Sequence, residues 1–381
     1  MNRIIQVDFF RGLLLILITT NHFLSKEDFI HHFTYEFIGW VTAAEGFVFL
    51  SGLTAGMVYS RKLVEKGEFF IAIAPKKRAW TIYKYHLVLL FIVIILLYTI
   101  PYIMHYWRYD MQVYKHPIQN PLRAVLLGSI LLYQPLYLDI LPMYALFMLL
   151  LPFVLRHFLK GNHLPILAGS FLIYLLGTFD IVSLLANQVE LLKPVNMGVF
   201  NLLSWQFLFT MGLYFGYLTF QKRVRPFLHN KQLLLGAVVI CLCLFIFKQV
   251  HFKIPGIERW NLDYLASKEN LGPLRLLHFF ALALVMSFLA SRYARWFSFK
   301  SIAYLGRYSL EVFALHILLI ILLRPIKEYS NSFQAVQLNE NLYFYPWATC
   351  MLFFILIPAL YLAPVIKNYL QNSRFKKRYI V

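Results

Sequence analysis

Charged side chains are scarce in this 381-residue chain, where Asp, Glu, Lys and Arg make up 14% of the residues. An ordinary soluble domain contains about 25%. The 17 acidic residues are outnumbered by 36 Lys and Arg, so the formal net charge is +19, and hydrophobic residues amount to 60%. These proportions exclude a soluble globular enzyme, because too few polar groups remain to cover its surface. They also exclude a disordered chain, which requires low hydrophobicity.

Cysteine is also sparse, and its positions indicate no cysteine chemistry. Cys241, Cys243 and Cys350 have neither the pattern of a disulfide framework nor the spacing of metal ligands. No two His residues have the spacing of a helical metal site, so we predict no metal.

The basic excess admits two interpretations. Strong positive charge is typical of nucleic-acid binding, but Lys and Arg also gather in the cytoplasmic loops of membrane proteins. In this chain they gather in alternate loops, namely 61–78, 222–231, 292–300 and the C-terminal tail. We therefore favour the second interpretation and predict no nucleic-acid partner.

Long apolar runs dominate the rest of the chain. About 20 apolar residues in helical form cross the core of a bilayer. Ten stretches have about this length: 8–25, 41–60, 80–104, 140–158, 164–184, 203–221, 232–249, 273–291, 302–323 and 346–368. We predict an all-α fold, a polytopic helical bundle in the lipid bilayer with about ten transmembrane helices. We expect residues 1–381 to form a single membrane-embedded domain.

The basic loops also predict the orientation of these helices. By the positive-inside rule the loops are cytoplasmic, both termini are cytoplasmic, and the number of spans is even. An eleventh apolar segment, 122–137, is short and is interrupted by proline and glycine. If it crossed the membrane, the later basic loops would lie outside. We therefore predict a re-entrant or interfacial segment on the outer side, which requires cover by protein or a wet cavity.

Polar residues inside apolar runs are costly at bilayer depth, so each is a functional candidate. In the predicted orientation one set, the outer layer, falls near the outer side of the membrane. Its members are His22, Glu45, Asp139, Tyr144, Trp205, Gln206, Arg275, His278 and His316. Because they come from separate parts of the chain, we expect them to meet in one site. For His278, an ordinary hydrogen bond between helices is an equal alternative.

His22 and Glu45 are the most specific pair of the outer layer. His22 lies about 21 Å up the first helix from Asp8, at about 1.5 Å per residue, and Glu45 begins the second helix at a similar depth. A carboxylate beside an imidazole makes a general base that takes a proton from a hydroxyl. The alternative is a structural ion pair between the first two helices. We favour the catalytic interpretation.

A second set, the inner layer, is cationic and aromatic and lies toward the cytoplasm. Its members are Arg11, Arg78, Trp80, Tyr83, Lys84, His86, Arg307 and Ser309. Arg and Lys bind phosphates and an aromatic ring stacks on a base, so this set suits an anionic ligand that contains a nucleotide. For residues 76–84 an ordinary basic flank is an equal alternative.

Several motifs resemble one family. The run Asp8-Phe9-Phe10-Arg11-Gly12-Leu13, followed by His22, resembles the opening of the OpgC family, and the most specific match is Ala43-Ala44-Glu45-Gly46-Phe47-Val48-Phe49-Leu50-Ser51-Gly52. Further similarity lies in Arg78 to His86, Asp139 to Tyr144, Trp205-Gln206 and Gly272-Pro273-Leu274-Arg275. Leu305 to Leu310, with Phe313 and His316, resembles the late helix motif of the type three membrane acyltransferase superfamily, to which the family is related. The resemblance covers nearly the whole chain.

The resemblance implies a membrane-bound O-acyltransferase of the bacterial inner membrane. Such an enzyme moves an acyl group, succinyl in the glucan case, from cytoplasmic acyl-CoA to a hydroxyl of periplasmic glucan or a related glycan. His22 then corresponds to the catalytic base, Glu45 to its partner, and His316 to a third catalytic candidate. The remaining outer layer would bind the glycan, and the inner layer would bind coenzyme A. Succinyl or acetyl donor, direct transfer or an acyl-enzyme, and the oligomeric state all stay open.

The chain departs from the superfamily at one signature. Arg78 corresponds to the first Arg of an Arg-x-x-Arg motif, but the second position is Thr81. Either Lys84 supplies the missing charge or the donor is held differently. We further expect Arg275 to neutralise a dicarboxylic acyl tail and so to favour succinyl.

The alternative function is a transporter or flippase of an anionic solute, because polar residues at two depths also mark a path. Transporters often contain interrupted helices in both halves of an inverted repeat. This chain has one interrupted segment without a counterpart, which favours the enzyme.

Overall fold

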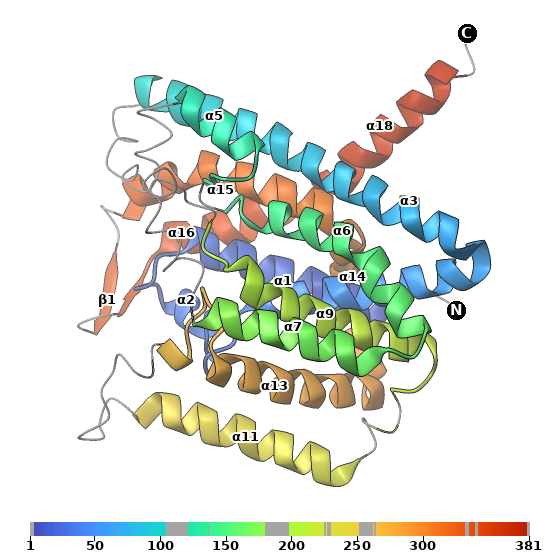
Figure 1. Cartoon of the computed structure of the whole chain (residues 1–381). Coiled ribbons are helices and arrows are strands. Elements are labelled where there is room, and N and C mark those ends of the chain that lie inside the picture. Colours follow the sequence, from blue (N-terminus) through green and yellow to red (C-terminus); the bar gives the residue numbers. More distant parts are fainter. Residues whose placement is uncertain are drawn as a thin grey trace. The chain divides into compact units, whose positions relative to one another are not determined.

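The apolar runs fold into helices almost throughout the computed structural model (Figure 1). It describes residues 4–103, 121–135, 137–179, 198–224, 226, 230–250, 262, 264–331, 335–339 and 342–378. Six helices among these residues are long and apolar enough to cross a membrane: Ala43–Leu97, Ile140–Leu159, Lys231–Gln249, Pro273–Arg292, Ser309–Lys327 and Pro346–Gln371. They indicate a multi-pass membrane protein. The predicted all-α class is confirmed for the described residues, apart from one short hairpin.

The chain divides into two compact units, and the first draws on residues 1–37, 91–119 and 293–381. Its helices are α1 (Ile5–Phe23), α2 (Phe29–Thr34), η5 (Ala294–Phe297), α14 (Lys300–Arg307), α15 (Ser309–Asn331), α16 (Pro346–Met351), η6 (Leu352–Leu356), α17 (Ile357–Ala359) and α18 (Leu362–Arg378). The antiparallel strands β1 (Val336–Asn339) and β2 (Leu342–Phe344) pair Val336 with Phe344, with a bulge between Gln337 and Asn339. The predicted span 302–323 is interrupted at Tyr308, between α14 and α15.

Two glycines, Gly12 and Gly306, let α1 and α14 cross with their backbones in contact. A methyl group on Gly12 would overlap the carbonyl oxygen of Ile302, and one on Gly306 would overlap the carbonyl oxygen of Asp8. Helices in membranes associate by such close packing of small residues. This crossing brings the start of α1 against the segment that leads into α15.

The second unit draws on residues 38–90 and 120–292. Its helices are the first part of α3 (Ala43–Ile103), α5 (Pro121–Ser129), α6 (Ile140–Leu159), α7 (His163–Thr178), α9 (Leu202–Phe220), α11 (Lys231–Val250) and α13 (Pro273–Arg292). Here α3 and α9 cross at glycines spaced four apart on each helix. A methyl group on Gly52 or Gly56 of α3 would overlap the backbone of α9, and Gly212 and Gly216 face α3 in the same way.

Helix α3 contains two of the predicted spans. The basic segment 61–78, which we predicted as a loop, is helical on both sides of Gly67. Its Arg, Lys, Glu and Ala residues favour helix, and Gly67 breaks the helix with φ 76° and ψ 177°, a conformation that costs glycine little. The two predicted spans therefore join through a helical kink.

The interrupted segment 122–137 contains only a short helix. Helix α5 has nine residues, about 13 Å at 1.5 Å per residue, against about 30 Å for a bilayer core. Two side chains of α3 bond the last carbonyl groups of α5: the Tyr83 hydroxyl donates to the Ser129 oxygen at 2.7 Å, and His86 Nε2 lies 3.0 Å from the Gly128 oxygen. Helix α3 thus holds the end of α5.

Candidate functional site

Two histidines meet in the first unit. His22, on the last turn of α1, and His316, on α15, place Nδ1 and Nε2 respectively 3.3 Å apart. Their ring centroids are 5.5 Å apart and their planes are inclined by 25°. His316 is fully buried, and its Nδ1 bonds the carbonyl oxygen of Phe313, one turn earlier on α15. Both residues were predicted as catalytic, but their contact was not.

A buried lysine lies where α1 ends, directly after His22. The side chain of Lys327 donates to the Phe23 carbonyl oxygen at 2.9 Å and to Ser25 Oγ at 3.1 Å. A cation at a helix C-terminus is favourable, because the last carbonyl groups carry partial negative charge. We did not select Lys327 from the sequence, since its place near the end of an apolar run is typical of a flanking charge.

Asp28 and His31 lie beside this lysine, outside the predicted spans. Asp28 caps α2 by accepting from the Ile30 amide at 2.8 Å. Burial raises the pKa of Asp28, although the amide bonds and the charge of Lys327 oppose the effect. Burial lowers the pKa of His31, which stacks on Tyr35. This end of the first unit therefore contains buried ionisable groups that we did not predict.

Three inner-layer residues belong to the same unit. Arg11 of α1 donates to Ser309 Oγ at the start of α15. Arg307 is exposed, and its guanidinium lies 5.9 Å from the ring centroid of Tyr308. The sequence-distant motifs that contain Arg11 and Ser309 thus meet, as the close crossing of α1 and α14 requires.

Glu45 of the second unit forms a buried ion pair with Arg275. Arg275 Nη1 donates to Glu45 Oε1 at 2.8 Å, and their side chains are 4% and 0% exposed. The other carboxylate oxygen, Oε2, accepts from the Thr42 amide at 2.9 Å and from its hydroxyl at 2.6 Å. Arg275 Nε also donates to the Ala266 carbonyl oxygen at 2.8 Å. The charge that we expected to receive an acyl carboxylate is therefore matched by Glu45 within the second unit.

His278 lies one turn after Arg275 and is fully buried. Neither ring nitrogen has a hydrogen-bond partner among the described residues. Gly39, at φ 107°, packs against the ring so closely that a methyl group there would overlap Cε1. Lys248 donates to the Gly39 carbonyl oxygen at 2.9 Å. The interhelical hydrogen bond that we considered for His278 is absent from the described part of the chain.

Asp139 and Trp205 hold loops of the second unit. Asp139 Oδ2 accepts from the Val199 amide at 2.9 Å, and burial raises the pKa of this carboxyl group just before α6. Trp205 is fully buried, and its Nε1 lies 3.2 Å and 3.1 Å from the carbonyl oxygens of Lys268 and Glu269. These contacts give both buried residues partners within the second unit, and their predicted roles in substrate binding stay predictions.

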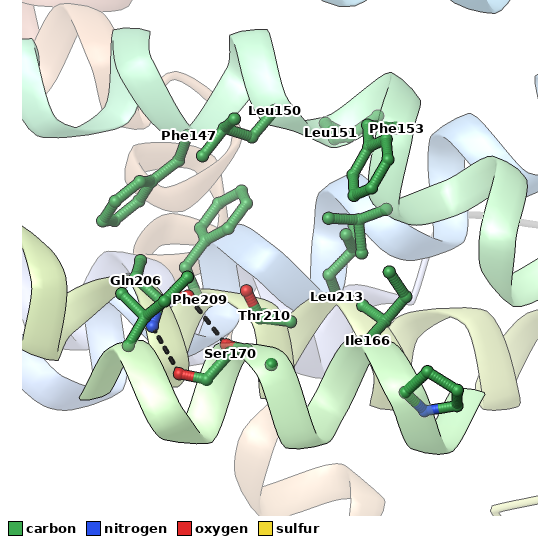
Figure 2. Close-up of a pocket in the computed structure, with 14 residues that line it drawn as sticks. Phe147, Leu150, Leu151, Phe153, Ile166, Ser170, Gln206, Phe209, Thr210 and Leu213 are labelled. Carbon is green, nitrogen blue, oxygen red and sulfur yellow. Dashed lines mark hydrogen bonds between the residues drawn. The ribbon is translucent and has the colours of Figure 1, made fainter. Parts of the chain in front are cut away.

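Gln206 lines a cavity of about 340 Å³ between α6, α7 and α9 (Figure 2). Its amide accepts from Ser170 Oγ at 2.7 Å and donates to the Ser170 carbonyl oxygen at 2.7 Å. Thr210 is the third polar residue of the lining, which is otherwise apolar. The cavity suits an apolar group better than a sugar, so a glycan contact by Gln206 stays a prediction.

Tyr144 lies in an aromatic cluster of the second unit. Its ring centroid is 6.0 Å from that of Phe47 and 6.4 Å from that of Phe209. Tyr144 is buried, and the cluster joins α6 to α3 and α9. Its predicted role in substrate binding stays a prediction.

Four of the remaining inner-layer residues form a surface strip on α3, namely Arg78, Trp80, Tyr83 and Lys84, whereas His86 is buried. The Trp80 ring, 55% exposed, stacks on Tyr83 at 5.4 Å between centroids, and Lys84 Nζ lies 5.4 Å from the Trp80 ring. Arg78 is also exposed. Tyr83 and His86 are at the same time engaged with α5. An exposed cation beside an exposed aromatic ring can bind a phosphate and stack on a base.

The predicted site residues thus fall into two groups. The first unit contains His22, His316, Arg11, Arg307 and Ser309, and the second contains the other twelve. The predicted pair of His22 with Glu45 joins residues of different units and stays a prediction. No three His, Cys, Asp or Glu residues within the described ranges are grouped as metal ligands.

Comparison with known proteins assigns the chain to a family. A family model described as OpgC protein matches residues 3–361, nearly the whole chain. No curated protein and no solved structure matches. The resemblance inferred from the motifs is therefore confirmed.

Proposed function

The chain belongs to the OpgC family, and we propose that it is an O-acyltransferase of the bacterial inner membrane. In this proposal it moves an acyl group, succinyl in the first instance, from cytoplasmic acyl-CoA to a hydroxyl of periplasmic glucan or a related glycan. Family membership supports this class of activity, and the identity of donor and acceptor is our proposal.

The proposed topology has ten spans with both termini in the cytoplasm. Each span has a helical counterpart: α1, the two parts of α3, α6, α7, α9, α11, α13, α15, and α16 to α18. Helix α5 is too short to cross and would remain on the outer side. This arrangement keeps every basic loop in the cytoplasm.

The observation that carries the proposal is the contact of His22 with His316. Two imidazoles from the two ends of the sequence meet inside an apolar unit, where polar groups are costly and mark function. His22 is the partly accessible member, and His316 is fully buried. His22 is therefore the proposed base, with His316 as its partner.

The chemistry balances without a cofactor. In direct transfer, His22 takes the proton of the glycan hydroxyl while the hydroxyl oxygen attacks the thioester carbonyl carbon. The carbon–sulfur bond then breaks, and the leaving thiolate of coenzyme A takes the proton from His22. The products are an acyl ester on the glycan and free coenzyme A.

The proposed donor site is the strip of α3 formed by Arg78, Trp80, Tyr83 and Lys84. Its exposed cations and stacked rings suit the phosphates and the base of coenzyme A. Lys84, over the Trp80 ring, is the proposed substitute for the second Arg of the superfamily signature.

The test uses purified protein in lipid vesicles, with succinyl-CoA labelled in its succinyl group and a glucan acceptor. We expect labelled glucan and free coenzyme A in equal amounts. His22→Ala should abolish both products while the protein remains folded and inserted, and His32→Ala, at an exposed histidine of the same unit, should retain them. Normal glucan labelling by folded His22→Ala would refute the proposal.

The same vesicles test the transporter alternative. A transporter would move an anionic solute across the vesicle membrane without releasing coenzyme A. Uptake of a labelled dicarboxylate or of acyl-CoA, with no thioester cleavage, would favour transport over acyl transfer.

A further inference from the structure

Both ring nitrogens of His316 are engaged, and this determines where its proton lies. Nδ1 bonds the Phe313 carbonyl oxygen. A carbonyl oxygen only accepts hydrogen bonds, so Nδ1 of His316 must carry a proton. In the neutral imidazole the other nitrogen, Nε2, then carries the lone pair and is an acceptor.

That acceptor lies 3.3 Å from Nδ1 of His22. Nδ1 of His22 must therefore be the protonated atom of its own neutral ring, because it donates to the lone pair of His316. The lone pair of neutral His22 is then on Nε2. The tautomer of a histidine is set in this way by the hydrogen bond that its other nitrogen makes.

We infer that His316 is a positioning residue, which fixes His22 as the tautomer protonated at Nδ1 and so makes Nε2 of His22 the atom that takes the substrate proton. This inference rests on the proposed function of His22 as the base. From the sequence we assigned the orienting role to the carboxylate of Glu45. The geometry assigns it to an imidazole whose own proton is held by a main-chain carbonyl of α15.

The arrangement also suits the charged intermediate. When Nε2 of His22 takes the hydroxyl proton, the ring becomes an imidazolium that still donates from Nδ1 to the neutral ring of His316. The two rings can share that positive charge, and the ring of His316 is shielded from water. The Phe313 carbonyl oxygen belongs to the main chain of α15, the helix that carries His316. The position of the His316 proton therefore does not depend on a mobile side chain.

The alternative is that the two rings pack only as aromatic neighbours. Stacking of the rings at 5.5 Å sets no proton position and would be kept by any flat side chain. The two interpretations differ in the tautomer of His22, which can be measured without substrate.

Two amide substitutions separate the two hydrogen bonds of His316. His316→Asn keeps a donor near the position of Nδ1, for the Phe313 carbonyl, but is too short to offer an acceptor to His22. His316→Gln can place its carbonyl oxygen near the position of Nε2 and so keeps the acceptor. Both are polar and smaller than histidine, so each controls for the packing change of the other.

The measurement is the ¹⁵N NMR spectrum of histidine-labelled protein in lipid nanodiscs, with His22 assigned by His22→Asn. In the wild type and in His316→Gln we expect the neutral His22 ring to be protonated at Nδ1. In His316→Asn the proton should move to Nε2, the tautomer that free histidine prefers. Circular dichroism and the thermal midpoint check that each variant is folded.

Activity gives the second readout. His316→Asn should lower kcat by about 10²–10⁴-fold, the range for loss of general-base catalysis, with KM for acyl-CoA unchanged, and His316→Gln should recover part of the loss. A His22 tautomer that stays protonated at Nδ1 in folded His316→Asn would overturn the inference. That result leaves the proposed function intact, which a folded and active His22→Ala variant would refute.

Discussion

Removing one partner of the buried pair Glu45–Arg275 should be one of the most destabilising single changes in the second unit. Removing one partner of a buried pair leaves an uncompensated charge and costs about 3–5 kcal/mol. Arg275→Met also loses the hydrogen bond to the Ala266 carbonyl oxygen, which contributes about 0.5–1.5 kcal/mol. We therefore expect this variant to lower the free energy of unfolding by about 3.5–6.5 kcal/mol in all.

A double-mutant cycle isolates the interaction between the two side chains. Glu45→Gln keeps an acceptor for Thr42 but leaves the Arg275 charge buried without its partner, so it should also cost about 3–5 kcal/mol. The double variant buries no unmatched charge. It should therefore be more stable, by about 2–3 kcal/mol, than the sum of the two single losses predicts. At about 1.4 kcal/mol per tenfold, this is roughly a 30- to 150-fold difference in the unfolding equilibrium constant.

The assay is unfolding by SDS in mixed micelles, followed by circular dichroism. The exposed pair Arg61–Glu65, with side chains 46% and 48% exposed, is the matched control. Arg61→Met and Glu65→Gln should change stability little, because water and salt screen exposed charges. A coupling between Glu45 and Arg275 no larger than that of the exposed pair would refute the reasoning.

Three further predictions concern other parts of the chain. Gly12→Ala should lower the free energy of unfolding by about 1–3 kcal/mol, because its methyl group forces α1 away from α14, as measured by SDS unfolding. Burial lowers the pKa of His31, so the unfolded chain protonates first on acidification and the stability of the wild type should fall below about pH 6.5. His31→Phe should remove this loss. Trp80→Leu should raise KM for acyl-CoA several-fold in the vesicle assay, because the exposed ring that we propose to stack on the base is lost.

Each of these predictions has its own control. Gly236→Ala, where nothing lies within 4 Å of the added methyl group, should be neutral or slightly stabilising, and an equal loss at both glycines would argue against the close crossing. The same pH dependence in wild type and His31→Phe would exclude His31 as its source. For Trp80→Leu, an unchanged KM would place the donor site elsewhere.

The fold class followed from the sequence because apolar runs of about 20 residues have few alternatives to a transmembrane helix. The positions of most helices were predicted within a few residues for the same reason. Segment 61–78 was predicted wrongly as a loop. Its charge indicated the side of the membrane, whereas its helix-favouring residues determined the backbone up to the break at Gly67.

The candidate site was predicted only as a set of residue types. Buried polar residues in apolar runs are visible in a sequence, so His22, Glu45, Arg275 and His316 were all selected. The contacts between them were not predicted, because residues on different helices that touch have no fixed spacing in a single sequence. The pairing of Glu45 with His22 stays a prediction, and within the second unit Glu45 pairs with Arg275, 230 positions later, which the sequence did not indicate.

The sequence by itself determined that this is a helical membrane protein, which family it belongs to, and which rare polar residues are candidates for function. Only the tertiary structure decided which of them touch, because contact depends on how the helices cross. The glycine crossings bring α1 to α14 and α3 to α9 at backbone distance. In the first unit α1 also packs against α15, where one imidazole lies against another, and that contact indicates which nitrogen of His22 is able to act as a base.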